Sequence, residues 1–259
     1  MRNARFIIAA IIALVSLATY FGTTSENPLT GEKQRVAMSP EQEIALGLRA
    51  APEMAAQMGG VSRNAEASAL VRRVGEKLVR ESLAARSPYK FSFHLLADPR
   101  TVNAFALPGG PVFITEGLLR HLKTEAEVAA VLGHEIAHVI ARHSSERLAK
   151  QQLTQGLVSA VVLGTGDYST AQIGQMVGGM INMKYGRGDE IESDRLGLRI
   201  MAAAGYDPRA MIHVMEVLAQ ASGGSRQPEF MSTHPAPENR AARIREEIAK
   251  LPAGNFERR

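Results

Sequence analysis

The sequence predicts a mainly α-helical domain with a small β-sheet, in the α+β class. Long segments repeat apolar residues with helical spacing, whereas only a few short segments alternate in the way of strands. Hydrophobic residues make up 45% and charged residues 22% of the 259 residues, which is enough to bury a sizeable core. The 23 Gly and 12 Pro follow no fixed period, so a collagen-like chain is excluded.

The N-terminus has the pattern of an export signal or membrane anchor. Arg2 and Arg5 precede an apolar run, Phe6–Phe21, that covers about 24 Å as a helix. This length suits the core of a signal peptide or a short anchor. Small residues allow cleavage after Ala18, so a cleaved and a retained leader both stay open. We assign residues 1–25 to this segment and expect the rest of the chain outside the cytoplasm.

A linker at 26–40 and one domain at 41–259 are expected to follow. The expected elements are helices at 39–58 and 64–85, a strand at 91–96, two short strands at 105–107 and 112–115, and helices at 125–150, 190–204, 208–221 and 237–251. The charge-poor segment Gly156–Gly188 is expected to form looser helices or a mobile lid over a cleft. No later segment has 18 consecutive apolar residues, so we expect no further membrane span.

Composition excludes several function classes. The net charge is +4 and falls to +2 when Arg2 and Arg5 are set aside, and no basic stripe is interleaved with aromatic residues. We therefore expect no nucleic-acid partner. The absence of cysteine excludes a disulfide scaffold, a thiol nucleophile, a Cys-ligated zinc site and a lipid-anchored N-terminal Cys. Any metal site must use histidines and carboxylates.

The segment His134-Glu135-Ile136-Ala137-His138 forms the pattern H-E-x-x-H inside an apolar helical run. Four residues rotate a helix by about 400°, so both imidazoles lie within about 40° and can reach one metal ion. Glu135 lies beside them, where its carboxylate can act on a water molecule as a general base. Burial of these groups without a partner is costly, so we predict a metal site. A hydrogen-bonded structural pair is the alternative.

A catalytic zinc site uses about three protein ligands, so one ligand remains to be found. A His six positions after His138 would complete one known pattern, but Ser144 occupies that position and Ala141 replaces the Gly that the pattern requires. His143 lies nine positions after His134, about 180° round the helix. We therefore expect His143 on the surface or behind the ligands.

An acidic cluster near residue 190 offers a carboxylate as the third ligand. Glu190 and Asp194 lie one turn apart on the same helix face, whereas Glu192 points about 200° away. A ligating Glu with an Asp one turn on suits zinc, because the Asp can hold the other N–H of a ligating imidazole. We predict that Glu190 is the ligand and Asp194 its support, with Glu192 as the rival ligand. An acidic first turn favoured by the helix dipole is the alternative.

Together these motifs resemble the gluzincin metallopeptidase family of the CAAX prenyl proteases and HtpX, and most nearly its small periplasmic BepA- and LoiP-type members. The resemblance covers roughly residues 27–250. The other matching motifs are Asn27–Gly31, Ser39–Glu43, Asn103–Phe105 with Pro108–Leu119, and Thr233-His234-Pro235 with Arg240. The chain departs from some relatives in having no lipid-anchoring Cys and no C-terminal repeat domain, which leaves substrate recruitment by such a domain in doubt.

The resemblance implies a zincin-like fold with one Zn²⁺ per chain and an outer strand that binds extended peptides. Val112, Phe113 and Ile114 are the candidate residues of that strand. The implied activity is that of a zinc endopeptidase acting on unfolded or misassembled envelope proteins. The implied location is the periplasm, either free or membrane-anchored through an uncleaved leader. Polypeptide substrates and the envelope assembly machinery are the implied partners.

The resemblance also gives roles to the late His-Pro motif. His234, with Asn103 nearby, is expected to stabilise the oxyanion or contact the peptide, and Arg240 to brace the site. His234 has two alternative roles: it occupies the fourth metal position and silences the enzyme, or it only caps a helix start. A non-catalytic chaperone that binds exposed strands is the alternative function, although it would not need Glu135 as a base.

Overall fold

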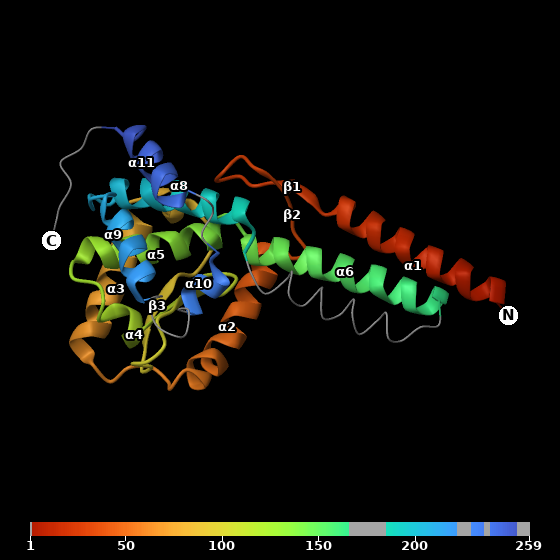
Figure 1. Cartoon of the computed structure of the whole chain (residues 1–259), viewed down its shortest axis with the longest axis horizontal. Helices are drawn as coiled ribbons and strands as arrows, with labels where there is room; N and C mark the ends of the chain where they lie inside the picture. The colour runs from red at the N-terminus through yellow and green to blue at the C-terminus, as the bar shows by residue number, and fades with distance from the viewer. Residues whose placement is uncertain (1, 166–184, 222–228, 236–238, 253–259) are drawn as a thin grey trace. The chain divides into compact units, whose positions relative to one another are not determined.

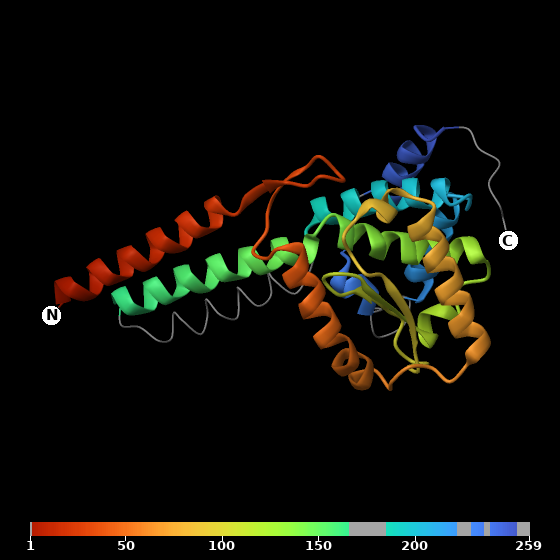
Figure 2. The same cartoon turned by 180° about the vertical axis from the view of Figure 1, so that it is seen from behind.

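The computed structural model describes residues 2–165, 185–221, 229–235 and 239–252 (Figures 1 and 2). Contacts divide the chain into two compact units, each made of two segments. Met1–Ser39 and Arg142–Tyr185 form the first, here called the N-terminal unit; Pro40–Ala141 and Gly186–Arg259 form the second, here called the site unit. The predicted domain at 41–259 thus includes a segment that packs with the N-terminal residues.

The N-terminal unit consists of two long helices and a short β-hairpin. These elements are α1 (Arg2–Gly22), β1 (Thr24–Glu26), β2 (Lys33–Arg35) and α6 (His143–Thr165). Figures 1 and 2 both show α1 and α6 side by side. β1 and β2 pair antiparallel, so the predicted linker at 26–40 contains a strand. Of the predicted segment Gly156–Gly188, α6 takes the first part, and residues 166–184 lie outside the described residues.

The site unit is mainly helical with one three-stranded sheet, which confirms the predicted fold class. Its helices are α2 (Pro40–Gln57), α3 (Ala65–Arg80), the 3₁₀ helix η1 (Leu83–Arg86), α4 (Glu116–Leu119), α5 (Glu125–Ile140), α8 (Arg187–Ala203), α9 (Ala210–Ala221), α10 (Glu229–Thr233) and α11 (Arg240–Ala249). Its strands are β3 (Ser92–Leu96), β4 (Ala104–Ala106) and β5 (Pro111–Thr115).

The sheet has the order β3-β5-β4, with β5 parallel to β3 and antiparallel to β4. Val112, Phe113 and Ile114 lie in the central strand and are at most 1% exposed, so the prediction that they form the outer strand was wrong. A central strand has its backbone groups paired on both sides and cannot accept an added peptide. β3 and β4 are the two outer strands of this sheet, a position that the period-2 pattern alone does not reveal.

Helix α5 begins and ends at clear local signals. Thr124 and Glu127 form a capping box: the Thr124 hydroxyl accepts from Glu127 N–H at 3.2 Å, and the Glu127 carboxylate accepts from Thr124 N–H at 3.3 Å. The helix ends before Arg142, whose φ of 62° lies in the left-handed region. The prediction of one helix over 125–150 was therefore wrong, because a left-handed residue interrupts the α5 hydrogen-bond ladder before α6 begins.

Two glycines let α5 and α8 cross closely. A Cβ on Gly197 would lie 3.2 Å from the backbone nitrogen of His134, and one on Gly133 would lie 3.4 Å from the carbonyl oxygen of Gly197. Larger residues at this crossing would push the two helices apart. The crossing therefore brings the first turns of α8, which carry Glu190 and Asp194, against the H-E-x-x-H segment of α5.

Candidate metal centre

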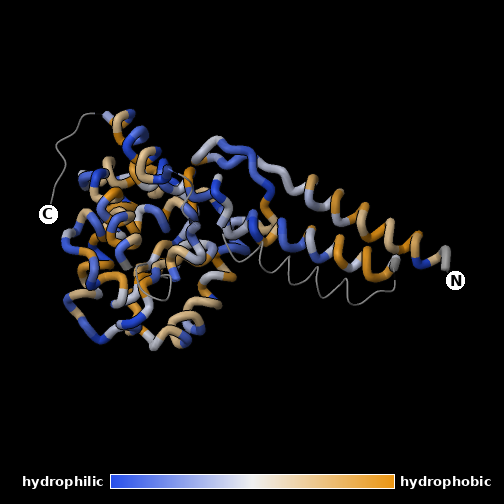
Figure 3. Tube along the Cα trace, viewed as in Figure 1, coloured by the Kyte–Doolittle hydropathy of each residue, from blue (hydrophilic) through white to orange (hydrophobic). Residues whose placement is uncertain are grey.

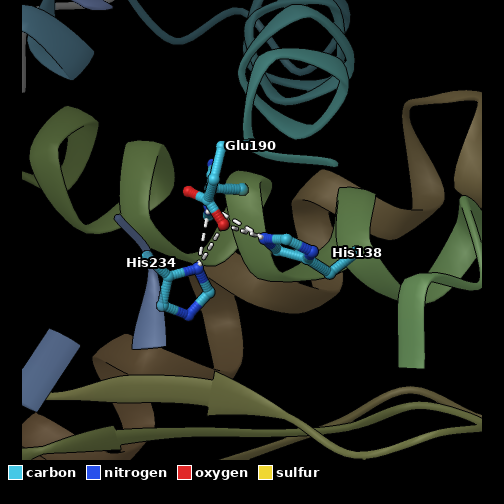
Figure 4. A group of neighbouring side chains, drawn as sticks. His138, Glu190 and His234 are labelled. Atoms are coloured by element: carbon cyan, nitrogen blue, oxygen red, sulfur yellow. Dashed lines mark hydrogen bonds and ion pairs between the residues drawn. The ribbon is translucent and has the colours of Figure 1, made fainter. Parts of the chain in front are cut away.

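Four buried side chains from three parts of the site unit converge on one point. His134 and His138 come from α5, Glu190 from α8, and His234 from the residue after α10. One ligand atom from each lies within 4.8 Å of the other three. Figure 4 shows the Glu190 carboxylate directed at the imidazoles of both His138 and His234. All four residues are at most 3% exposed.

The distances in this cluster are those of groups arranged around a shared cation. Nε2 of His138 lies 3.0 Å from Nε2 of His134 and 3.4 Å from Oε1 of Glu190. Nε2 of His134 lies 3.4 Å from Oε2 of Glu190. That carboxylate oxygen is buried and accepts no hydrogen bond from the described residues. Two imidazoles and a carboxylate are a donor set typical of catalytic zinc, so the residues fit this metal.

Asp194 and Arg240 contact the ligand residues outside the point where the ligand atoms converge. Nδ1 of His134 lies 3.0 Å from Oδ1 of Asp194, so this carboxylate contacts the side of the ring that faces away from Nε2 and fixes its orientation. Arg240 donates from Nε and Nη2 to Asp194 at 2.7 and 2.8 Å, and its Nη1 lies 3.3 Å from Oε2 of Glu190. The guanidinium is 5% exposed, so this is a buried and strongly coupled ion-pair network.

The network shifts the pKa values of its members in opposite directions. Burial alone would lower the pKa of His134, but the adjacent carboxylates of Asp194 and Glu190 outweigh it and raise the pKa to about 9. Burial alone would raise the pKa of Glu190, yet the adjacent imidazoles of His134 and His138 hold it well below its usual range. The carboxylates of Asp194 and Glu190 therefore favour a positive charge at this point of the cluster.

Glu135 lies beside the cluster, and its carboxylate makes no hydrogen bond within the described part of the chain that would give it a structural role. The residue is fully buried, and neither carboxylate oxygen accepts a hydrogen bond from the described residues. Nε2 of His234 lies 3.6 Å from Oε1. Burial raises the pKa of Glu135, and the nearby His234 and His134 oppose the increase only in part. A buried carboxylate of raised pKa next to a ligand cluster is suited to proton transfer.

His234 lies among the ligand atoms, the place that one of its alternative roles, occupation of the fourth metal position, gives it. Its Nδ1 lies 3.0 Å from Oε1 of Glu190 and 3.4 Å from Nε2 of His134. Phe230 stacks on the imidazole of His234 with ring centroids 4.4 Å apart, and the His234 N–H donates to the Phe230 carbonyl. Sequence reasoning missed Phe230, although an aromatic residue one helical turn before a candidate His is a usable signal.

Other predicted residues lie outside this ligand group. Glu192 is half-buried on α8 and does not belong to the cluster, whereas Glu190 does. His143 is 1% exposed and belongs to the N-terminal unit, so the surface position, one of its two predicted places, was wrong. Its ring lies 6.4 Å from that of Tyr185. Asn103 is buried next to β4, and its Oδ1 accepts no hydrogen bond from the described residues.

Comparison with known proteins agrees with this site. Residues 32–248 match the family described as Peptidase family M48. A β-barrel assembly-enhancing protease of Yersinia pestis is 31% identical over 228 residues, which cover 84% of this chain and 46% of that protein. The mitochondrial metalloendopeptidase OMA1 of Schizosaccharomyces pombe is 36% identical over 181 residues, or 68% of this chain and 51% of that protein. The chain spans about half the length of these curated relatives.

Proposed function

Because this chain belongs to peptidase family M48, we propose that it is a zinc-dependent endopeptidase. The observation that carries the proposal is the buried cluster of His134, His138 and Glu190 beside Glu135, whose carboxylate accepts no hydrogen bond from the described residues. These three side chains would hold one zinc ion per chain. Zinc supplies a Lewis acid there, which polarises a peptide carbonyl and acidifies a water molecule.

Glu135 is the proposed general base. Its carboxylate takes the proton from the attacking water and returns it to the nitrogen of the leaving amine. The raised pKa that burial gives this carboxylate makes it a better proton acceptor than an exposed glutamate. Asp194 and Arg240 do not take part in proton transfer in this proposal. They hold the ring of His134 and the carboxylate of Glu190 in fixed orientations.

The outer strand β4 is the proposed docking edge for an extended peptide. Leu107 N–H donates to the Pro111 carbonyl and Thr115 N–H donates to the Asn103 carbonyl, so odd-numbered positions of this segment face β5. In an antiparallel pair the alternate residues, Ala104 and Ala106, direct their backbone groups to the opposite side. A substrate held there by main-chain hydrogen bonds would be recognised with loose sequence preference.

Unfolded or misassembled envelope proteins are the proposed substrates. Two lines support this proposal: the apolar N-terminal helix, which fits an export signal or anchor, and the similarity to assembly-enhancing proteases. Such substrates expose extended backbone that an outer strand can pair with. We propose an exported enzyme that faces the periplasm, with the envelope assembly machinery as a candidate partner.

His234 has a second proposed role besides contact with the peptide or its oxyanion. Its Nδ1 lies within the ligand group, where a water molecule or a peptide carbonyl would otherwise reach the metal. In this arrangement the enzyme is at rest, and His234 must move before a substrate can bind. His234→Ala should then raise basal peptidase activity, whereas a simple loss of activity would favour a role in stabilising the oxyanion.

The substitution Glu135→Gln separates the enzyme from a chaperone that binds without cutting. We expect digestion of an unfolded protein to slow by about 10²–10⁴-fold, while zinc content stays unchanged. Glu125→Gln makes the same change in the first turn of α5 and serves as the control. Cleavage by the Glu135→Gln protein at the wild-type rate would contradict the proposed mechanism. No cleavage by the wild type under any condition would favour the chaperone.

A further inference from the structure

The N-terminal unit exposes apolar side chains on both of its long helices. Figure 3 shows hydrophobic residues along α1 and along the second half of α6. The large apolar residues exposed on these helices are Phe6, Ile7, Ile8, Ile11, Leu14, Val15, Phe21, Val161 and Leu163. Their exposed fractions run from 38% for Leu163 to 66% for Leu14. A surface of this extent next to water is a liability unless something apolar covers it.

Helix α6 changes character along its length. Its first eight residues, 143–150, include Glu146, Arg147 and Lys150, whereas 153–165 contains no charged residue. The second part is about 20 Å long as a helix. Two of its hydroxyl groups form hydrogen bonds within the helix: Thr154 donates to the Lys150 carbonyl at 2.9 Å, and Ser159 to the Gln155 carbonyl at 2.8 Å. Such internal bonds lower the cost of placing hydroxyls in hydrocarbon.

Small residues form the contact between the two helices. Gly156, Ala160 and Gly164 recur every four residues on α6, the small-xxx-small spacing that lets helices approach closely in lipid. A Cβ on Gly156 would lie 2.8 Å from the Cβ of Ser16, and one on Gly164 would lie 3.5 Å from the Cβ of Ala9. The helices are therefore antiparallel, and any larger residue at Gly156 would force them apart.

Polar and aromatic groups mark the two ends of this helix pair. Near the first end, Arg5 lies before the apolar run, and Gly164 of α6 reaches the level of Phe6 and Ala9. At the other end, the Arg35 guanidinium lies 5.2 Å from the ring centre of Tyr20 and 5.1 Å from that of Phe21. Cations and aromatic rings at both ends, with uncharged apolar surface between them, match the two interfaces and the core of a bilayer.

We propose that α1 and the second half of α6 insert together into a lipid bilayer as one antiparallel helix pair. The leader is then a retained anchor. Cleavage after Ala18 would remove most of α1, including Ala9 and Ser16, which contact α6. α1 alone among the described helices is long and apolar enough to cross a membrane by itself. α6 enters beside it because the close contact covers its small-residue face with α1 and leaves apolar residues facing lipid.

The absence of cysteine makes a direct test of the helix contact straightforward. The full chain with Ala9→Cys and Gly164→Cys, isolated in membranes and oxidised, should form an intramolecular disulfide, because a Cβ on Gly164 would lie 3.5 Å from the Cβ of Ala9. The pair Ile7→Cys and Gly164→Cys is the control, since Ile7 is 61% exposed on α1, and should not cross-link. Equal cross-linking of both pairs, or a purified chain whose mass lacks residues 1–18, would overturn the proposal.

Labelling with a membrane-impermeant maleimide tests insertion of α6 itself. In intact membranes Val161→Cys should react at least about 10-fold more slowly than Lys150→Cys, because a bilayer at Val161 would exclude the polar reagent. Detergent should remove most of that difference, since Val161 is 47% exposed on the protein itself. Equal labelling of the two variants in intact membranes would show that α6 stays in water and would overturn the proposal. Neither measurement uses peptidase activity, so the outcome is independent of the proposed enzyme function.

Discussion

The two units of the molecule depart from the usual distribution of polar and apolar residues in opposite directions. The site unit buries Glu135, Glu190 and His234 completely, whereas the N-terminal unit leaves Ile7 at 61% and Leu14 at 66% exposure. Buried carboxylates are costly unless a cation or a proton-transfer role accounts for them. Exposed apolar helices are costly unless lipid covers them. The first departure is the one that a metal site requires, and the second is the one that the proposed insertion into a bilayer requires.

Removing the buried guanidinium should have the largest effect on the stability of the site unit. Arg240→Leu leaves the carboxylates of Asp194 and Glu190 without their cation, and we expect a loss of about 3–5 kcal/mol in the free energy of unfolding. The measurement is a urea titration followed by far-ultraviolet circular dichroism. Arg209→Leu is the matched control, because Arg209 pairs with Asp207 in the same forked way but at the surface. An equal loss of unfolding free energy in both variants would contradict the claim that the buried ion pair matters more than the exposed one.

Packing in the same unit gives a smaller expected effect. Gly75 lies in α3 directly against the buried ring of Phe93, where a methyl group would overlap the ring. We expect Gly75→Ala to cost about 1–3 kcal/mol, measured by the same titration. At Gly188, in the first turn of α8, an added Cβ would meet no heavy atom within 4 Å. Gly188→Ala should therefore stabilise the protein by about 0.4–1 kcal/mol. The same sign for both substitutions would contradict this account.

The smallest predicted effect lies in the N-terminal unit. Arg35→Ala removes a cation from the faces of Tyr20 and Phe21, a contact worth about 0.5–1 kcal/mol at an exposed site. Amide exchange in the β1–β2 hairpin should then accelerate about 2- to 5-fold, measured by hydrogen–deuterium exchange. Lys33→Ala, on the same strand and exposed, is the control and should leave exchange unchanged. A larger effect from Lys33→Ala would sink the role given to Arg35.

The sequence predicts well those features that depend on local spacing. The i, i+4 relation brings His134 and His138 together, and the same relation brings both Glu190 and Asp194 next to His134. Hydrophobic periodicity likewise predicts most of the longer helices and the three short strands of the site unit, but not the short helices α4 and α10. These features depend on helix and strand geometry that a few neighbouring residues determine.

Features that depend on tertiary contacts or on single dihedral angles are not predictable in this way. The end of α5 depends on the left-handed conformation of Arg142, a residue type that rarely adopts it. Which strand lies at the edge of the sheet depends on which strands pair. The apolar segment Val112–Ile114 suits a central strand and an outer strand equally, so its sequence does not reveal that it lies in the centre and β4 at the edge. The contact of α1 with α6 joins residues about 140 positions apart. The sequence shows the small-residue spacing of α6 but does not show that α1 is the helix it packs against.

The zinc content of the purified full chain tests the central claim most directly, beside its Glu190→Ala and Glu192→Ala variants. The cluster geometry predicts about one zinc per chain in the wild type and in Glu192→Ala, and none in Glu190→Ala. Both variants remove one carboxylate from α8, so a general effect of charge on the helix would appear in both. Absence of zinc from carefully prepared wild type, or its loss with Glu192→Ala alone, would contradict the proposed ligand set.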